Sequence, residues 1–169
     1  WTRTRFEALS DLLFAYLGQM ARTSGKNYVL ALRTPLMEEL SKKFFELGLR
    51  FDWIESSSPI LSTHVLKEQL RPRTGLVIMP WICPYTGIVQ PVIETLEFLR
   101  EEGVLTLLDA TLAIGNLFFE LKELKADAYL FEMDEKGSLL ATLPTTLWEK
   151  SLKNFTDLEE VKKIEDLSM

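Results

Sequence analysis

The sequence is poor in the residues that most often build metal sites and catalytic triads. Its 169 residues include one cysteine, Cys83, and one histidine, His64. A single cysteine excludes an intramolecular disulfide and a cysteine-based metal cluster, and a single histidine excludes His-rich metal sites and most catalytic triads. We therefore expect Cys83 to be structural or inert, and His64 to be a surface or capping residue.

Glycine-rich phosphate motifs and long apolar runs are also missing. Neither a GxGxxG pattern nor a P-loop occurs among the eight glycines, which argues against nucleotide binding. No apolar run reaches the roughly 18 to 20 residues of a membrane span, and the first residues do not resemble a signal peptide. We expect a soluble, cytoplasmic protein with no membrane association.

Basic residues are outnumbered by acidic ones. The chain has 19 Lys and Arg against 25 Asp and Glu, which gives a net charge of −6. Proteins that bind the phosphate backbone of nucleic acids are normally basic. The most basic stretch, residues 67–73, is short and interrupted by Pro72, so we expect no nucleic-acid partner.

The overall composition, with 47% hydrophobic and 26% charged residues, is that of an ordinary globular protein, and we expect one domain spanning residues 1–169. An α/β core is expected over residues 27–143, between an amphipathic N-terminal helix (1–22) and a C-terminal helix (146–169). Within the core, apolar runs predict strands at 28–32, 51–54, 76–80, 104–109 and 128–133, alternating with helices that include 91–102 and 116–124. This order implies a mostly parallel sheet with helices on both faces, and residues 138–143 could return as one antiparallel strand.

The helix after the first strand carries the clearest local signals. Thr34 can cap it, Pro35 suits its first position, and Gly48 ends it. Its buried face is expected to comprise Leu36, Leu40, Phe44, Phe45 and Leu47.

Asp109 is the strongest candidate for a functional residue. It ends a buried apolar strand, and an acid at the C-terminal tip of a parallel strand lies where open α/β sheets place ligand chemistry. Strand-end aspartates also cap turns and helices in every α/β fold, so a purely structural role stays open. We expect Thr34, Pro80 and Asp109 to lie near one edge of one sheet, because each follows or ends a parallel strand.

Residues 29–137 resemble the large domain of pyridoxal phosphate (PLP) enzymes of fold type I, in particular the class V aminotransferase and cysteine desulfurase branch. The resemblance rests on the order of elements and on residues 103–110, GVLTLLDA, with a small residue, an apolar strand, an acid and a small residue. It implies a three-layer α/β fold. It also implies that Asp109 corresponds to the acid that pairs with the pyridine nitrogen of the cofactor.

The other cofactor positions that the resemblance implies are altered. Lys136 lies one residue after the expected place of the Schiff-base lysine, among acids that favour an exposed turn. Arg5 falls in the phosphate-gripping segment, which has lost its hydroxyls. Arg33 or Thr34 falls where an aromatic residue or histidine would stack on the ring.

Two further positions near the strand ends differ from the family. Pro84 replaces an asparagine in the turn that ends at Thr86 and Gly87, and Leu112 replaces a glutamine. These changes predict a degenerate domain that needs no cofactor and acts through a homodimer or a protein partner. One alternative is a PLP-dependent aminotransferase, lyase or desulfurase-like enzyme completed by another subunit, with Asp109 and Lys136 in the family roles. Another is a small phosphate-ligand binder at Thr86, Gly87 and Asp109.

The resemblance also concerns the length of the chain. Fold type I enzymes add a small domain after the lysine, whereas only residues 137–169 follow Lys136 here. We therefore expect a large domain that stands alone and covers its apolar surface by association.

Overall fold

The computed structural model describes residues 25–119, 123–132 and 139–142. Both predicted terminal helices, and the candidate residues Arg5 and Lys136, lie outside these ranges. Within them the chain alternates strands and helices as expected. The elements are β1 (Tyr28–Ala31), α2 (Pro35–Glu46), β2 (Arg50–Trp53), α3 (Thr63–Gln69), β3 (Thr74–Pro80), α4 (Val92–Glu101), β4 (Leu105–Asp109), β5 (Ala128–Glu132) and β6 (Leu139–Thr142).

The strands form a six-stranded sheet with the order β2-β1-β3-β4-β5-β6. Strands β1 to β5 pair in parallel, and β6 pairs antiparallel with β5. The predicted mostly parallel sheet with one late antiparallel strand is therefore confirmed. Strand β3 is buried along its whole length, which explains its nearly continuous apolar sequence.

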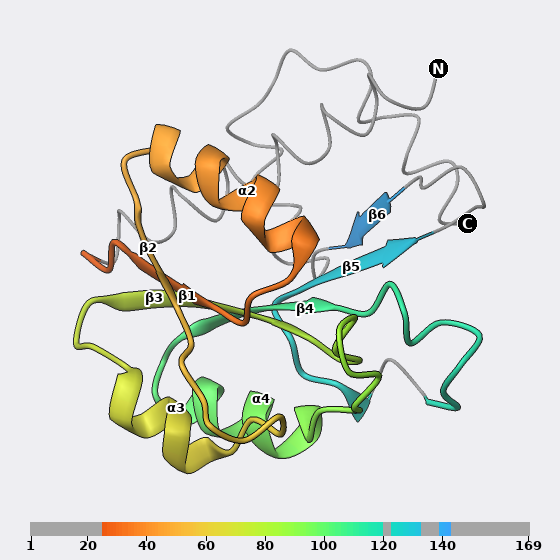
Figure 1. Ribbon diagram of the computed structural model, residues 1–169. Helices are drawn as coiled ribbons and strands as arrows, with labels where there is room; N and C mark the ends of the chain where they lie inside the picture. Colours follow the sequence, from red (N-terminus) through yellow and green to blue (C-terminus); the bar gives the residue numbers. More distant parts are fainter. Residues whose placement is uncertain (1–24, 120–122, 133–138, 143–169) are drawn as a thin grey trace.

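Helices cover both faces of the sheet, as predicted (Figure 1). On one face, α2 packs Met37, Leu40 and Phe44 against a core that includes alternate residues of β1, β3 and β4. On the other face, α3 and α4 cover the intervening residues of these strands. The result is a three-layer α/β domain. Because β1 to β5 are parallel, their C-terminal ends lie together at one edge of the sheet and their N-terminal ends at the opposite edge.

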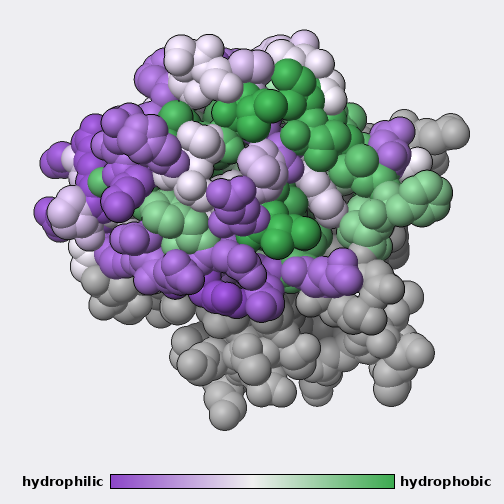
Figure 2. Space-filling model, turned by 90° about the horizontal axis from the view of Figure 1, so that it is seen from below, coloured by the Kyte–Doolittle hydropathy of each residue, from purple (hydrophilic) through white to green (hydrophobic). Residues whose placement is uncertain are grey.

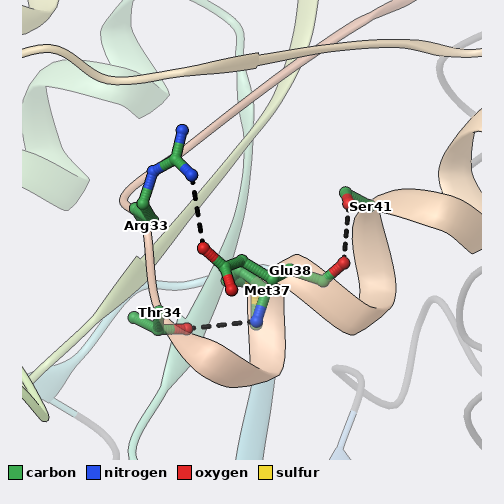
Figure 3. Close-up of polar contacts among 5 residues, drawn as sticks. All are labelled: Arg33, Thr34, Met37, Glu38 and Ser41. Atoms are coloured by element: carbon green, nitrogen blue, oxygen red, sulfur yellow. Dashed lines mark hydrogen bonds and ion pairs between the residues drawn. The ribbon is translucent and has the colours of Figure 1, made fainter.

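The start of α2 follows the predicted capping pattern (Figure 3). The hydroxyl of Thr34 accepts a hydrogen bond from the backbone N–H of Met37 at 3.1 Å, and Pro35 takes the first turn. Gly48, with φ +76°, follows the last turn in a left-handed conformation that favours glycine. One detail of the predicted buried face is wrong: Phe45 is 77% exposed, because successive helical residues point about 100° apart and Phe44 takes the inward position.

The segment after β4 also differs from the prediction. A helix was expected from residue 116, but residues 111–116 form turns and residues 117–119 are not helical. The N–H groups of Ala113 and Ile114 donate to the carbonyl oxygen of Ala110, so the turn begins directly after the strand. Gly115, near the end of these turns, takes a left-handed conformation with φ +78°. Among the described helices, none has the length and apolarity of a membrane span.

Candidate functional site

Asp109 ends β4 at the C-terminal edge of the sheet. The register places it opposite Pro80 of β3 and Leu130 of β5. Its carbonyl oxygen accepts a hydrogen bond from the N–H of Trp81 at 2.8 Å, and the residue as a whole is only 7% exposed. Thr34 follows β1, which runs parallel to β3, so the predicted gathering of Thr34, Pro80 and Asp109 at one edge is confirmed.

The carboxylate of Asp109 is held in place by the residue two positions further on. Its Oδ1 accepts hydrogen bonds from the N–H of Thr111 at 3.0 Å and from the Thr111 hydroxyl at 2.7 Å. This is the capping arrangement that short acidic side chains make at the start of a turn. The structural role considered for Asp109 is therefore present, and the same bonds fix the direction of a negative charge at the sheet edge.

Thr86 and Gly87 lie in a hairpin loop that follows β3. Ile82 and Val89 bridge the base of the loop, and Gly87 has a φ of +69°. The N–H groups of Thr86 and Gly87 both donate to the carbonyl oxygen of Cys83, at 3.3 and 2.8 Å. The loop thus already uses the backbone donors that a phosphate would require.

Cys83 lies half-buried inside this loop. Burial raises the pKa of its thiol, but hydrogen bonds from the Thr86 hydroxyl and from the N–H groups of Tyr85 and Thr86 outweigh burial, so that the pKa lies below its ordinary value. Hydrogen bonds to the sulfur stabilise the thiolate, so this thiol loses its proton more readily than that of an ordinary cysteine. His64, by contrast, is exposed on α3 beside Glu68, in agreement with its predicted surface position.

Arg33 and Thr34 stand where the resemblance expects a flat side chain over the cofactor ring. The hydroxyl of Thr34 is the cap of α2, and Thr34 is 1% exposed. The guanidinium of Arg33 lies 4.6 Å from the ring centroid of Trp53 and 3.2 Å from a carboxylate oxygen of Glu38. Figure 3 shows Arg33 turned toward Glu38 at the first turn of the helix.

The fit of PLP to these residues is incomplete. Asp109 offers a fixed acid of the kind that pairs with a pyridine nitrogen. Thr34 offers no flat surface, Arg33 is engaged by Trp53 and Glu38, and the side chain of Leu112 can form no hydrogen bond. Among the described residues, Asp109 is thus suited to pair with the cofactor, and neither Arg33 nor Thr34 is suited to stack on its ring. They also contain no cluster of three His, Cys, Asp or Glu side chains suited to a metal ion.

Two features of this edge escaped the sequence analysis. Thr111 was not recognised as the partner of Asp109, although an acid followed two residues later by threonine is a known turn pattern. The ring of Trp81 packs against Phe119 with centroids 4.4 Å apart. This contact joins two loops, and no local sequence pattern indicates it.

Comparison with known proteins agrees with the fold. The aminotransferase class-V family matches residues 43–133. Cysteine desulfurase IscS of Dechloromonas aromatica (strain RCB) is 33% identical over 137 residues, which cover 78% of this chain and 33% of that protein. Putative cysteine desulfurase NifS of Bacillus subtilis (strain 168) is 32% identical over 69 residues, 41% of this chain and 18% of that protein. The chain thus spans about a third or less of the curated relatives it matches.

Solved structures with the same fold are more distant in sequence. The apo structure of a cysteine desulfurase from Thermococcus onnurineus NA1 has a TM-score of 0.66 at 18% identity and covers 83% of this chain and 37% of that one. DndA from Streptomyces lividans has a TM-score of 0.65 at 20% identity, covering 80% and 39%. Because the family match extends over more than half of the sequence, this chain belongs to the aminotransferase class-V family.

Proposed function

We propose that this domain keeps the fold of the class V family without performing PLP chemistry, and that it acts through protein contacts, either with itself or with a partner. The observation that carries the proposal is that Thr34 is buried and bonded to the helix that follows it. Its hydroxyl caps α2, and the residue is almost fully buried, which supports the view that the Thr34 side chain is not available to cover a cofactor ring. PLP supplies an electron sink when it is bound, and that chemistry requires a ring held in a defined orientation.

The neighbouring arginine does not compensate for Thr34. A guanidinium is planar and can stack on a ring, but the face of Arg33 is already directed at Trp53, and Glu38 neutralises its charge. To cover a cofactor, Arg33 would have to leave both partners. This cost supports a protein that no longer retains PLP.

One observation favours the alternative, a PLP-dependent aminotransferase, lyase or desulfurase-like enzyme completed by another subunit. Asp109 is fixed by Thr111 at the sheet edge, where the family places its acid. In that case Asp109 would pair with the pyridine nitrogen and Lys136 would bind the cofactor covalently. The third candidate, a binder of small phosphate ligands at Thr86, Gly87 and Asp109, has less support because the loop uses its own N–H donors.

An absorbance titration with PLP separates these functions. We expect purified protein mixed with PLP to develop no visible band that borohydride removes. We also expect Lys136→Ala to change the free energy of unfolding by no more than about 0.5 kcal/mol, as exposed substitutions usually do. Lys125→Ala, at an exposed position of the described chain, is the matched control for non-specific reaction of lysines. A borohydride-sensitive band that Lys136→Ala abolishes and Lys125→Ala keeps would establish the enzyme instead.

Association is the other measurable part of the proposal. Large domains of the family that this chain resembles usually pair through their large-domain face. We expect a homodimer at micromolar concentration, with an interface above about 1,000 Å², the rough minimum for a specific contact. Sedimentation velocity across a range of concentrations tests this. A monomer at every concentration would contradict self-association and leave only a heteromeric partner.

A further inference from the structure

A hollow with an apolar floor and an acidic rim lies at the start of α4. Its volume is about 370 Å³. Trp81, Val92 and Ile93 supply its apolar lining, while Glu94 and Glu97 supply its charge. Figure 2 views the molecule from the side of α3 and α4 and shows apolar side chains gathered next to charged ones on this face.

The sequence of α4 explains why these side chains point outward. Val92, Thr95, Leu96 and Leu99 are buried against the sheet. Ile93, Glu94 and Glu97 therefore occupy the opposite face of the helix, in agreement with their exposure. Ile93 is 54% exposed and lines the same hollow as Trp81, so the two side chains contribute apolar surface at one place.

The loops around the hollow add to the apolar surface and are held together. Ile60, Tyr85 and Val89 are also exposed. The buried side chain of Gln90 joins their loops: its Oε1 accepts from the N–H of Leu61 at 2.8 Å, and its Nε2 donates to the carbonyl oxygen of Pro59 at 2.9 Å. A surface held by such bonds is preorganised, which lowers the entropic cost of binding.

The charge at the rim restricts what the hollow can accept. Among the described residues, none that lines the hollow is basic, and none forms an ion pair with Glu94 or Glu97. The whole chain is itself acidic, with a net charge of −6. The complementary ligand is therefore a segment in which an apolar side chain, for the floor, stands beside lysine or arginine, for the rim.

We infer that this hollow docks a partner protein through a segment that combines an exposed apolar anchor with flanking basic residues. The inference rests on the proposed function, because it names the surface through which a non-catalytic domain would act. Apolar anchors in central pockets carry most of the affinity of protein interfaces, and rim charges select the partner. Ile93 and Trp81 form the anchor site, and Glu94 and Glu97 form the selecting rim.

A labelled amphipathic peptide of leucine and lysine is the probe, and a matched peptide of leucine and glutamate is its control. We expect the leucine–lysine peptide to bind with a micromolar Kd and the leucine–glutamate peptide to bind at least tenfold more weakly. Ile93→Ser and Glu97→Lys should each raise the Kd for the leucine–lysine peptide at least tenfold. Circular dichroism confirms that these exposed substitutions leave the fold intact.

Two variants on the opposite face of the sheet match these changes in kind. Phe45→Ser removes an exposed apolar side chain from α2, and Glu46→Lys changes the net charge as Glu97→Lys does. Both should bind the peptide as the unmodified protein does. Equal losses in all four variants, equal binding of both peptides, or no binding of the leucine–lysine peptide would overturn the inference. Self-association that Ile93→Ser abolishes would also overturn it, because a second copy would then occupy the hollow.

The outcome is separable from that of the PLP titration. Peptide binding that depends on Ile93, in a protein that also shows a borohydride-sensitive band, would refute the loss of cofactor chemistry and keep the docking site. Failure of the peptide, with no band, would refute the docking site alone.

Discussion

Replacing Phe44 with alanine should lower the free energy of unfolding by about 3 to 5 kcal/mol. The ring is fully buried between α2 and the sheet, where its centroid lies 6.0 Å from that of Phe51. Its removal forfeits the burial of a large apolar side chain and leaves a cavity that the rigid sheet below cannot fill. Urea unfolding followed by circular dichroism measures the change.

The next residue provides an unusually close control. Phe45→Ala removes the same side chain one position along the same helix, but from a site that is 77% exposed. We expect its effect to stay within about 0.5 kcal/mol, since exposed substitutions away from special contacts are nearly neutral. Similar losses for the two variants would mean that a partner or another part of the chain buries Phe45.

This pair also shows how far a sequence pattern reaches. The pattern predicted α2 and its Thr34 cap, because capping chemistry and helical period are local properties. It assigned both phenylalanines to the buried face, but Phe45 lies about 100° around the helix from Phe44, on the side exposed to solvent. The strands were predicted well for a similar reason: β3 is buried on both faces, so its sequence is apolar throughout.

The site was predicted less completely than the fold. Asp109 was recognised because it ends an apolar run, and parallel strands bring their ends to one edge. The turn after it was misplaced, because the start of that turn depends on the hydrogen bonds that Thr111 donates to the Asp109 carboxylate and not on an apolar period. The engagement of Arg33 by Trp53, on another strand, is a tertiary contact that no local pattern encodes.

The last expected result concerns what Asp109 does. Asp109→Ala should lower the free energy of unfolding by about 1 to 3 kcal/mol, because it leaves the N–H and the hydroxyl of Thr111 without their acceptor at a buried strand end. Asp109→Asn should cost less, since an amide oxygen can accept the same two hydrogen bonds. Denaturant unfolding of the two variants, compared with the unmodified chain, measures both changes.

The two variants distinguish between a role of Asp109 as a hydrogen-bond acceptor in the turn and a role that depends on its negative charge. A carboxylate that serves only as a turn cap is replaced well by asparagine and poorly by alanine, in the order just given. A carboxylate kept for a cofactor is a buried charge that the fold tolerates at a cost in stability, and removing it relieves that cost. If Asp109→Asn raised the free energy of unfolding above that of the unmodified protein, the negative charge of Asp109 would not contribute to the stability of the fold. That result would support the alternative of a PLP-dependent enzyme, against which the buried Thr34 argues.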